Sequence, residues 1–121
     1  MPDEYTALVT AMKALTQGEV PNEVTLPVAE YEWQTRPDAD SYGIIALDFE
    51  TGALEGDNAK QVTAYEGSVD LFSHQKRGGG WIEKITETLT EHCESAWRLN
   101  LCTYETETRL FHWEWAFQIE G

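Results

Sequence analysis

The sequence predicts an α+β fold: a mainly antiparallel sheet of four to five strands, two helices packed on one of its faces, and a C-terminal β-hairpin. Three observations predict it. Apolar residues recur at helical spacing in residues 3–17 and 81–96, and they alternate with polar residues along residues 111–119. The length of 121 residues suits one hydrophobic core and is too short for two, so residues 1–121 are expected to form a single domain.

The first predicted helix spans residues 3–17. Its apolar residues recur three and four positions apart, as in the buried stripe of an amphipathic helix: Tyr5, Leu8, Val9, Met12 and Leu15. Asp3 is suited to cap the first turn, where its charge faces the positive end of the helix dipole. Gly18 is expected to end the helix, because glycine accepts the left-handed conformation found after helix C-termini.

The next region, residues 19–40, is predicted to be an extended arm. Its three prolines cannot donate hydrogen bonds to a sheet, and only residues 28–33 alternate well enough for a short edge strand. Residues 41–50 then predict a strand with two distinct faces. Ile45, Leu47 and Phe49 are expected on one face. The other face would carry Tyr42, Ile44, Ala46 and Asp48.

A loop, a strand, a second loop and the second helix follow. Residues 51–60 predict a loop, and residues 61–73 a strand in which Gly67 marks a bulge or bend. Residues 74–80 include Lys76, Arg77 and three glycines, so they predict a flexible and locally basic loop. The helix is expected over residues 81–96, with one face formed by Trp81, Ile82, Ile85, Leu89, His92, Cys93 and Ala96.

The C-terminal part predicts a β-hairpin. Trp97, Leu99 and Leu101 alternate with more polar residues, residues 105–108 form the turn, and a long strand returns. One face of that strand is apolar throughout, with a strict period of two: Phe111, Trp113, Trp115, Phe117 and Ile119. Core packing under the helices is the simpler use of this stripe, and a partner-binding surface is the alternative.

The charge balance restricts the partners. The chain has 22 acidic and 8 basic residues, which give a formal net charge of -14. Direct nucleic-acid binding is not expected, because its affinity comes from Lys and Arg side chains that displace counterions from phosphates. The sequence has neither a long apolar stretch nor the features of a signal peptide, so membrane insertion and export by that route are not expected. Cys93 and Cys102 are expected to be free thiols, although a disulfide is geometrically allowed.

No motif predicts catalysis, a cofactor or a metal site. Residues 78–80 are three glycines before a helix, but the Lys-Ser or Lys-Thr of a phosphate-binding loop is missing, so a turn is favoured. His74, His92 and His112 lack a recognised ligand spacing. The carboxylates are too numerous for any pair to indicate acid–base catalysis. The chain is therefore not expected to be an enzyme.

Two stretches of sequence carry a recognisable pattern. Residues 65–73 read Tyr-Glu-Gly-Ser-Val-Asp-Leu-Phe-Ser, and residues 104–115 read Tyr-Glu-Thr-Glu-Thr-Arg-Leu-Phe-His-Trp-Glu-Trp, with a predicted helix between them. This order resembles the tail-terminator or tail-completion (minor tail) proteins of long-tailed bacteriophages and prophages. Those families have a Val-Asp-aromatic-Ser strand, a helix, a Tyr-Glu-x-Glu-Thr turn and a His-aromatic strand. The similarity covers residues 65–120, about half of the chain.

The resemblance implies a structural role in the virion. Such proteins form a ring, usually a hexamer, that caps the tail tube when it has reached its length and offers a surface for joining the head. The implied partners are copies of the chain itself, the tail tube protein and a head–tail connector or stopper protein. The implied location is the head–tail junction, after synthesis in the host cytoplasm. Contacts in a ring are heterologous, so one patch of each copy meets a different patch of the next.

Contacts with neighbours are expected in three regions that lack apolar periodicity: the arm, the loop at residues 51–60 and the basic loop. Their charged residues are the candidate interface residues: Glu30, Glu32, Arg36, Asp38, Asp40, Glu55, Asp57, Lys76 and Arg77.

Two other functions compete with this interpretation. The charge alone favours an acidic DNA-mimic inhibitor, whose carboxylates imitate phosphates and occupy a basic cleft of an enzyme. Paired acidic residues at phosphate-like spacing on one face would favour it, and an oligomeric ring would count against it. A head-completion or minor capsid protein of the same phage module is the other alternative, and the sequence does not separate it from a terminator.

Overall fold

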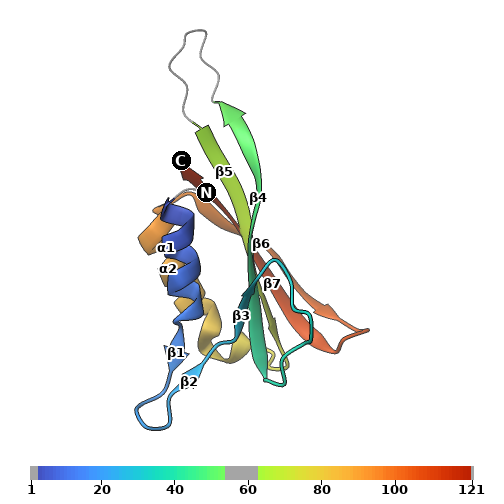
Figure 1. Ribbon diagram of the computed structural model, residues 1–121. Helices are drawn as coiled ribbons and strands as arrows, with labels where there is room; N and C mark the ends of the chain where they lie inside the picture. Colours follow the sequence, from blue (N-terminus) through green and yellow to red (C-terminus); the bar gives the residue numbers. More distant parts are fainter. Residues whose placement is uncertain (1–2, 54–62, 121) are drawn as a thin grey trace.

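The computed structural model describes residues 3–53 and 63–120 and has an α+β fold (Figure 1). Two helices, a short 3₁₀ turn and seven strands follow one another in this order: α1 (Asp3–Lys13), β1 (Thr16–Gln17), β2 (Val24–Thr25), β3 (Val28–Glu30), β4 (Ser41–Ala53), β5 (Thr63–Ser73), the 3₁₀ turn (Gly78–Gly80), α2 (Trp81–Cys93), β6 (Trp97–Glu105) and β7 (Leu110–Glu120).

The main sheet has five strands in the order β3-β4-β5-β7-β6. The pairs β4–β5, β5–β7 and β6–β7 are antiparallel, whereas β3 lies parallel to β4. The sheet is therefore mixed, and the prediction of a mainly antiparallel sheet is only partly right. The parallel pair arises because residues 31–40 carry the chain back to the end of the sheet from which β3 started, as a parallel connection requires.

Both helices lie side by side on one face of this sheet (Figure 1). Their apolar stripes pack against the apolar faces of β4, β5 and β7 in one core cluster. Its helical members are Tyr5, Leu8, Val9, Met12, Trp81, Ile85, Leu89 and Cys93, and the members from these three strands are Ile45, Val69, Leu71, Trp113, Trp115, Phe117 and Ile119. The aromatic stripe of the last strand is thus part of the core, because the helices cover that face.

The first helix is shorter than predicted. It ends at Lys13, and residues 16–17 instead form β1, which pairs with β2 in a small antiparallel hairpin. Gly18 lies in that hairpin with φ +89°, so its left-handed conformation makes a turn and does not end the helix. The second helix also ends early, at Cys93, because Glu94 has a φ of +54° and leaves the helical conformation.

Two bulges, one at Asp48 in β4 and one in β6, change the predicted strand faces, and β4 has a further register shift between Glu50 and Gly52. In β4 the register skips Asp48, so that Leu47 pairs with Gly67 while Phe49 pairs with Glu66, and the alternation predicted through Phe49 is broken. Gly67 was predicted to mark a bulge or bend in its own strand; the bulge lies instead on the neighbouring strand β4, opposite Gly67. β4 extends to Ala53, so the predicted loop at 51–60 starts too early, and residues 54–62 lie outside the described residues.

The second bulge lies in β6, where the register skips Asn100. Leu99 pairs with Trp115, but Leu101 pairs with Glu114, so the two leucines lie on opposite faces of the sheet. The predicted common face of Trp97, Leu99 and Leu101 is therefore wrong. The predicted hairpin itself is confirmed, because β6 and β7 are antiparallel neighbours joined by residues 106–109.

Candidate interaction surfaces

The face of the sheet away from the helices carries a stack of three rings. Tyr42, Phe72 and His112 are register partners on three neighbouring strands. The ring centroids are 5.1 Å apart for Tyr42 and Phe72 and 4.2 Å apart for Phe72 and His112, and both pairs are stacked. Burial raises the pKa of Tyr42, although the positive charge of Arg36 in the arm opposes this shift. The stack is thus a second, smaller contact layer on the face away from the helices.

Two carboxylates hold the ring of His112. Its Nε2 lies 2.7 Å from Asp70 Oδ1, and its Nδ1 lies 3.0 Å from Glu105 Oε2. Burial lowers the pKa of His112, but the hydrogen bonds and charges of Asp70 and Glu105 outweigh burial and raise the pKa above its ordinary value. The imidazolium form satisfies both carboxylates because both of its ring nitrogens donate. His112 therefore links β5, β6 and β7 through charge.

More carboxylates lie on the same face. Asp48 and Glu114 both have a raised pKa, because burial first and then the negative charge of Asp70 disfavour their ionised forms. Within the described residues, no group of three or more His, Cys, Asp or Glu side chains is arranged to hold a metal ion. This acidic row can repel anions or attract a basic partner.

The outer edge of β6 is a second feature of the surface. Among the described strands, β6 pairs only with β7, so its other backbone edge has no strand neighbour. Three large apolar side chains of this strand have relative exposures between 37% and 45%. They form the edge patch: Leu99, Leu101 and Tyr104. An unpaired edge with exposed apolar side chains is a site at which another chain can add a strand.

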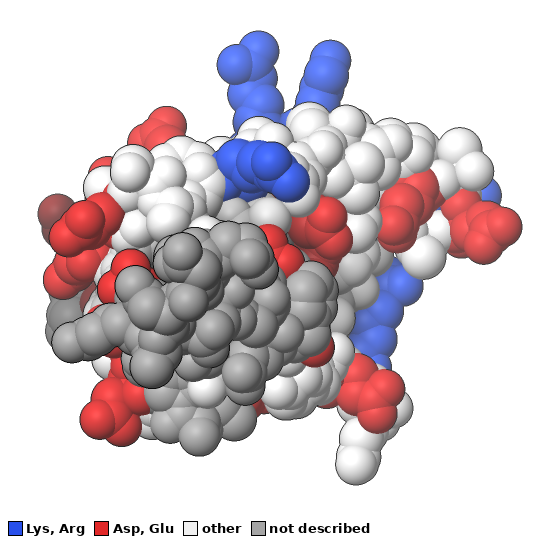
Figure 2. Space-filling model, turned by 90° about the horizontal axis from the view of Figure 1, so that it is seen from above, with Lys and Arg blue, Asp and Glu red and all other residues white. Residues whose placement is uncertain are grey.

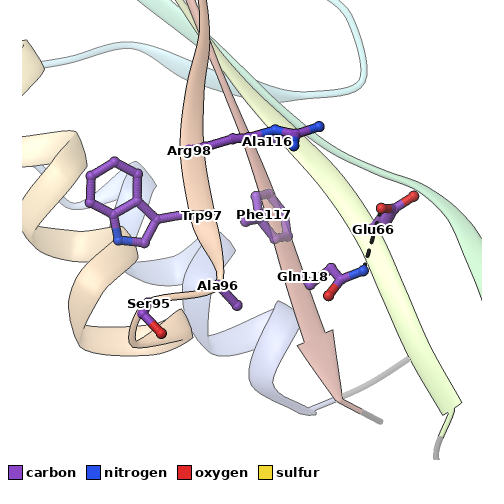
Figure 3. Close-up of a pocket in the computed structure, with 8 residues that line it drawn as sticks. All are labelled: Glu66, Ser95, Ala96, Trp97, Arg98, Ala116, Phe117 and Gln118. Atoms are coloured by element: carbon purple, nitrogen blue, oxygen red, sulfur yellow. Dashed lines mark hydrogen bonds between the residues drawn. The ribbon is translucent and has the colours of Figure 1, made fainter. Parts of the chain in front are cut away.

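An open pocket of about 300 Å³ lies where β7 extends past the start of β6 (Figure 3). Trp97 points toward the helices and Arg98 toward the opposite side, while Gln118 Nε2 donates a 3.4 Å hydrogen bond to Glu66 Oε1 (Figure 3). The residues that line this pocket are Glu66, Ser95, Ala96, Trp97, Arg98, Ala116, Phe117 and Gln118. Among these lining residues no nucleophile is paired with a base, and the pocket is an open notch in the sheet edge.

The β1–β2 hairpin is the third feature. It projects from the body of the molecule below the helices (Figure 1). Val20 and Val24 are exposed at 80% and 59%, and together they form the hairpin patch. Of the six exposed large hydrophobic residues in the described part of the chain, five belong to the edge patch or the hairpin patch, and Tyr31 is the sixth.

The predicted interface residues fall into separate groups. Glu30 lies in β3 and accepts a 2.9 Å hydrogen bond from the hydroxyl of Tyr5, so it stabilises the fold. Glu55 and Asp57 lie outside the described residues. The remaining six are exposed in the arm or in the basic loop: Glu32, Arg36, Asp38, Asp40, Lys76 and Arg77.

The structure brings part of the arm and the basic loop together. The carbonyl oxygen of Asp40 accepts a 2.9 Å hydrogen bond from the backbone of His74, and its carboxylate accepts a 3.4 Å bond from Gln75. The predicted arm includes Val20 and Val24, but only its charged residues were singled out, and the edge patch was not predicted. In the sequence, Val20 stands alone between a glutamate and a proline, and Val24 between a glutamate and a threonine. Neither belongs to a helical or strand pattern, and this isolation is the signal that could have identified them.

Acidic side chains spread around the molecule as viewed from above, whereas Lys and Arg occupy a few places (Figure 2). Within the described residues, the ion pairs within 4.0 Å are those of His112, and none joins a Lys or Arg to a carboxylate. The described lysines and arginines thus have no ion-pair partner among the described residues. They are available to acidic groups of a neighbouring molecule.

The sequence matches no known protein-family model, and no curated protein matches it significantly. No helix in the described part of the chain has the length and apolar character needed to cross a membrane.

Proposed function

We propose that this chain is a structural virion protein of the tail-terminator kind, whose copies form a ring that caps the phage tail tube and contributes to the head–tail junction. The resemblance of residues 65–73 and 104–115 motivates the proposal. The observation that carries it is the presence of two separate apolar patches, the hairpin patch and the edge patch, on one chain. Two different patches give heterologous contacts, which close into a ring when the rotation between copies permits.

In this role the chain binds proteins and carries out no reaction, so it needs neither a cofactor nor a metal. The ring would contact the tail tube protein on one side and a connector or stopper protein on the other. Exposed charged residues of the arm and the basic loop, such as Arg36, Asp38 and Lys76, supply polar contacts for these neighbours. A lumen rich in carboxylates would let DNA pass without binding, because like charges repel.

The test is the mass of the purified chain by light scattering over a range of protein concentrations, with negative-stain electron microscopy of the same samples. We expect rings of about six copies, either alone or after addition of assembled tail tubes. A chain that stays monomeric at every concentration and does not bind tube ends would refute the proposal. A ring that binds the connector but not the tube would indicate a head-completion protein.

The acidic-inhibitor alternative also has a specific observation in its favour. The face of the sheet away from the helices carries carboxylates on neighbouring strands: Glu66, Asp70 and Glu114. Asp48, in the β4 bulge, has a pKa raised by burial and then by the charges of Asp70 and Glu66. A monomer that forms a complex with a DNA-binding enzyme, and is displaced from it by duplex DNA, would replace the ring proposal with this one.

A further inference from the structure

The arrangement of apolar side chains on β6 indicates the kind of partner that fits its edge. Leu99 and Tyr104 pair in register with Trp115 and Phe111, on the helix side of the sheet, whereas Leu101 pairs with Glu114 on the other side. Exposed apolar groups on both faces of one edge suit a strand that pairs with the edge and contacts both faces. They do not suit a partner that covers a single face.

The edge lacks most of the usual features that prevent strand addition. β6 contains no proline and no lysine, it is nine residues long, and its charged side chains are Arg98 and Glu105. Natural edge strands are usually short or carry prolines, lysines or inward charges, which discourage pairing with other chains. The bulge at Asn100 is the one protective feature that β6 has.

The β1–β2 hairpin supplies a complementary surface. Val24 and Thr25 of β2 are exposed, and β2 pairs only with β1 among the described strands, so its other edge is unpaired. The hairpin and the β6–β7 turn project from different sides of the molecule, with the hairpin at lower left and the turn at lower right in Figure 1. The tip of the hairpin therefore suits contact with a second molecule better than contact with its own β6.

Charge also favours this pair of surfaces. Residues 16–25 contain Glu19 and Glu23 and no basic residue, so most of this acidic molecule repels them. Residues 97–104 contain Arg98 and no carboxylate. Arg98 is exposed, and its Nε donates a 2.8 Å hydrogen bond to Asn100 within the same strand. The hairpin is thus acidic, whereas residues 97–104 of β6 carry one positive charge and no carboxylate.

We propose that the β1–β2 hairpin of one copy docks on the β6 edge of the next copy, with Val20 and Val24 against Leu99, Leu101 and Tyr104. This inference rests on the proposed self-assembly and names the surfaces that carry it. The contact is heterologous, so each copy uses its hairpin on one neighbour and its β6 edge on the other. Each contact is small, and closure into a ring adds stability because every copy is then held twice.

The chain offers a built-in probe of this contact. Cys102 is exposed on β6, whereas Cys93 is buried, and burial together with the charge of Glu4 raises the pKa of its thiol to about 11. Cys93 is therefore a poor nucleophile, and Cys102 is the reactive thiol. The variant Val24→Cys places a second exposed thiol on the hairpin, so a mild oxidant will join neighbouring copies from hairpin to edge.

We expect Val24→Cys to give a ladder of covalent dimers, trimers and larger species on a non-reducing gel. The matched control is Glu87→Cys, which places the new thiol on the exposed side of α2, and it should give about tenfold less of the species beyond dimers. Adding Cys102→Ser to Val24→Cys should abolish the ladder, because the chain then has no thiol on the edge.

Four results would overturn the inference. A wild-type chain that oxidises efficiently to a Cys102–Cys102 dimer would mean that two β6 edges pair symmetrically. Dimers of the Val24→Cys, Cys102→Ser variant would mean that two hairpins meet. If light scattering finds the ring but Val24→Cys gives no more ladder than Glu87→Cys, the proposed function stands and these surfaces are wrong. A chain that is monomeric throughout would overturn the function and the inference together.

Discussion

The aromatic ring of Phe117 lies against Gly67, its register partner on the neighbouring strand. A Cβ atom at position 67 would overlap this ring on one side and the backbone carbonyl oxygen of Ala46 on another. Phe117 is buried in the core, so its ring has little room to move. Glycine is therefore required here by the close approach of its neighbours.

We expect Gly67→Ala to lower the free energy of unfolding by about 1–3 kcal/mol, because the core must shift to admit the methyl group. Urea unfolding followed by tryptophan fluorescence measures this change. The matched control is Ser68→Ala, next along the same strand and on the other face, which should change stability by less than about 0.5 kcal/mol. Equal stability of Gly67→Ala and the wild type would contradict the contact.

Gly67 also illustrates what the sequence could and could not predict. The period of two in β7 and the helical periods of α1 and α2 predicted most of the core, because burial under helices imposes those periods directly. Ala96, predicted on the face of the second helix, is instead exposed beyond the end of α2. A glycine within a strand suggested a bulge, but the bulge lies at Asp48 on the partner strand. The position of a bulge depends on the register between two strands, and neither strand encodes it alone.

The candidate surfaces were predictable to a smaller extent. The charged residues of the arm are exposed as expected, yet Glu30 bonds to Tyr5, a contact between positions 25 residues apart. Leu99 and Leu101 were assigned to one face because the bulge at Asn100 leaves no mark in the sequence. Their exposure follows from the position of β6 at the sheet edge, which is set by the order of all five strands.

The position of His112 between Asp70 and Glu105 predicts a pH dependence of stability. The pKa of His112 is raised in the folded state, so the stabilisation is fully present below the ordinary histidine pKa and is lost as pH rises through the folded value. We expect His112→Gln to cost about 1–2 kcal/mol of unfolding free energy near pH 5.5 and clearly less near pH 9. Urea unfolding at both pH values measures the two differences.

The control for this effect is His74→Gln, which changes an exposed histidine in the basic loop. It should leave the pH dependence of stability as it is in the wild type. If His112→Gln has the same cost at both pH values, the charge of the imidazolium does not stabilise the sheet, and its stacking on Phe72 accounts for the loss instead.

Glu114 is expected to be mildly destabilising when ionised. Burial and the nearby charge of Asp70 raise its pKa, which means that the folded state disfavours its negative charge. Glu114→Gln should therefore raise the unfolding free energy at neutral pH by about 0.5 kcal/mol. The matched control is Glu87→Gln on the exposed side of α2, which should be neutral. A loss of stability in Glu114→Gln would mean that its attraction to His112 outweighs the repulsion.

The hydrogen bond from Tyr5 to Glu30 ties α1 to β3. Tyr5 is buried, and its hydroxyl lies 2.9 Å from the Glu30 carboxylate. We expect Tyr5→Phe to lower the unfolding free energy by about 1–2 kcal/mol, since the change removes the donor and keeps the ring. Tyr104→Phe removes an exposed hydroxyl from the edge patch and should have no measurable effect. Equal thermal midpoints for Tyr5→Phe and Tyr104→Phe would argue against a stabilising bond.

Self-association should strengthen with salt. Each copy carries a formal net charge of -14, so copies repel one another at long range, and salt reduces this repulsion. In the proposed contact, salt would also weaken the attraction of Glu19 and Glu23 to Arg98, but that attraction involves few charges. The apolar contacts proposed between Val24 and Leu101 would not be weakened. We therefore expect the mass-average size in light scattering to rise between about 0.05 M and about 0.5 M sodium chloride.

The variant Leu101→Glu, which adds a charge to the edge patch, should form smaller particles than the wild type at both salt concentrations. A fall in particle size with salt would mean that ion pairs hold the copies together and that the apolar patches do not.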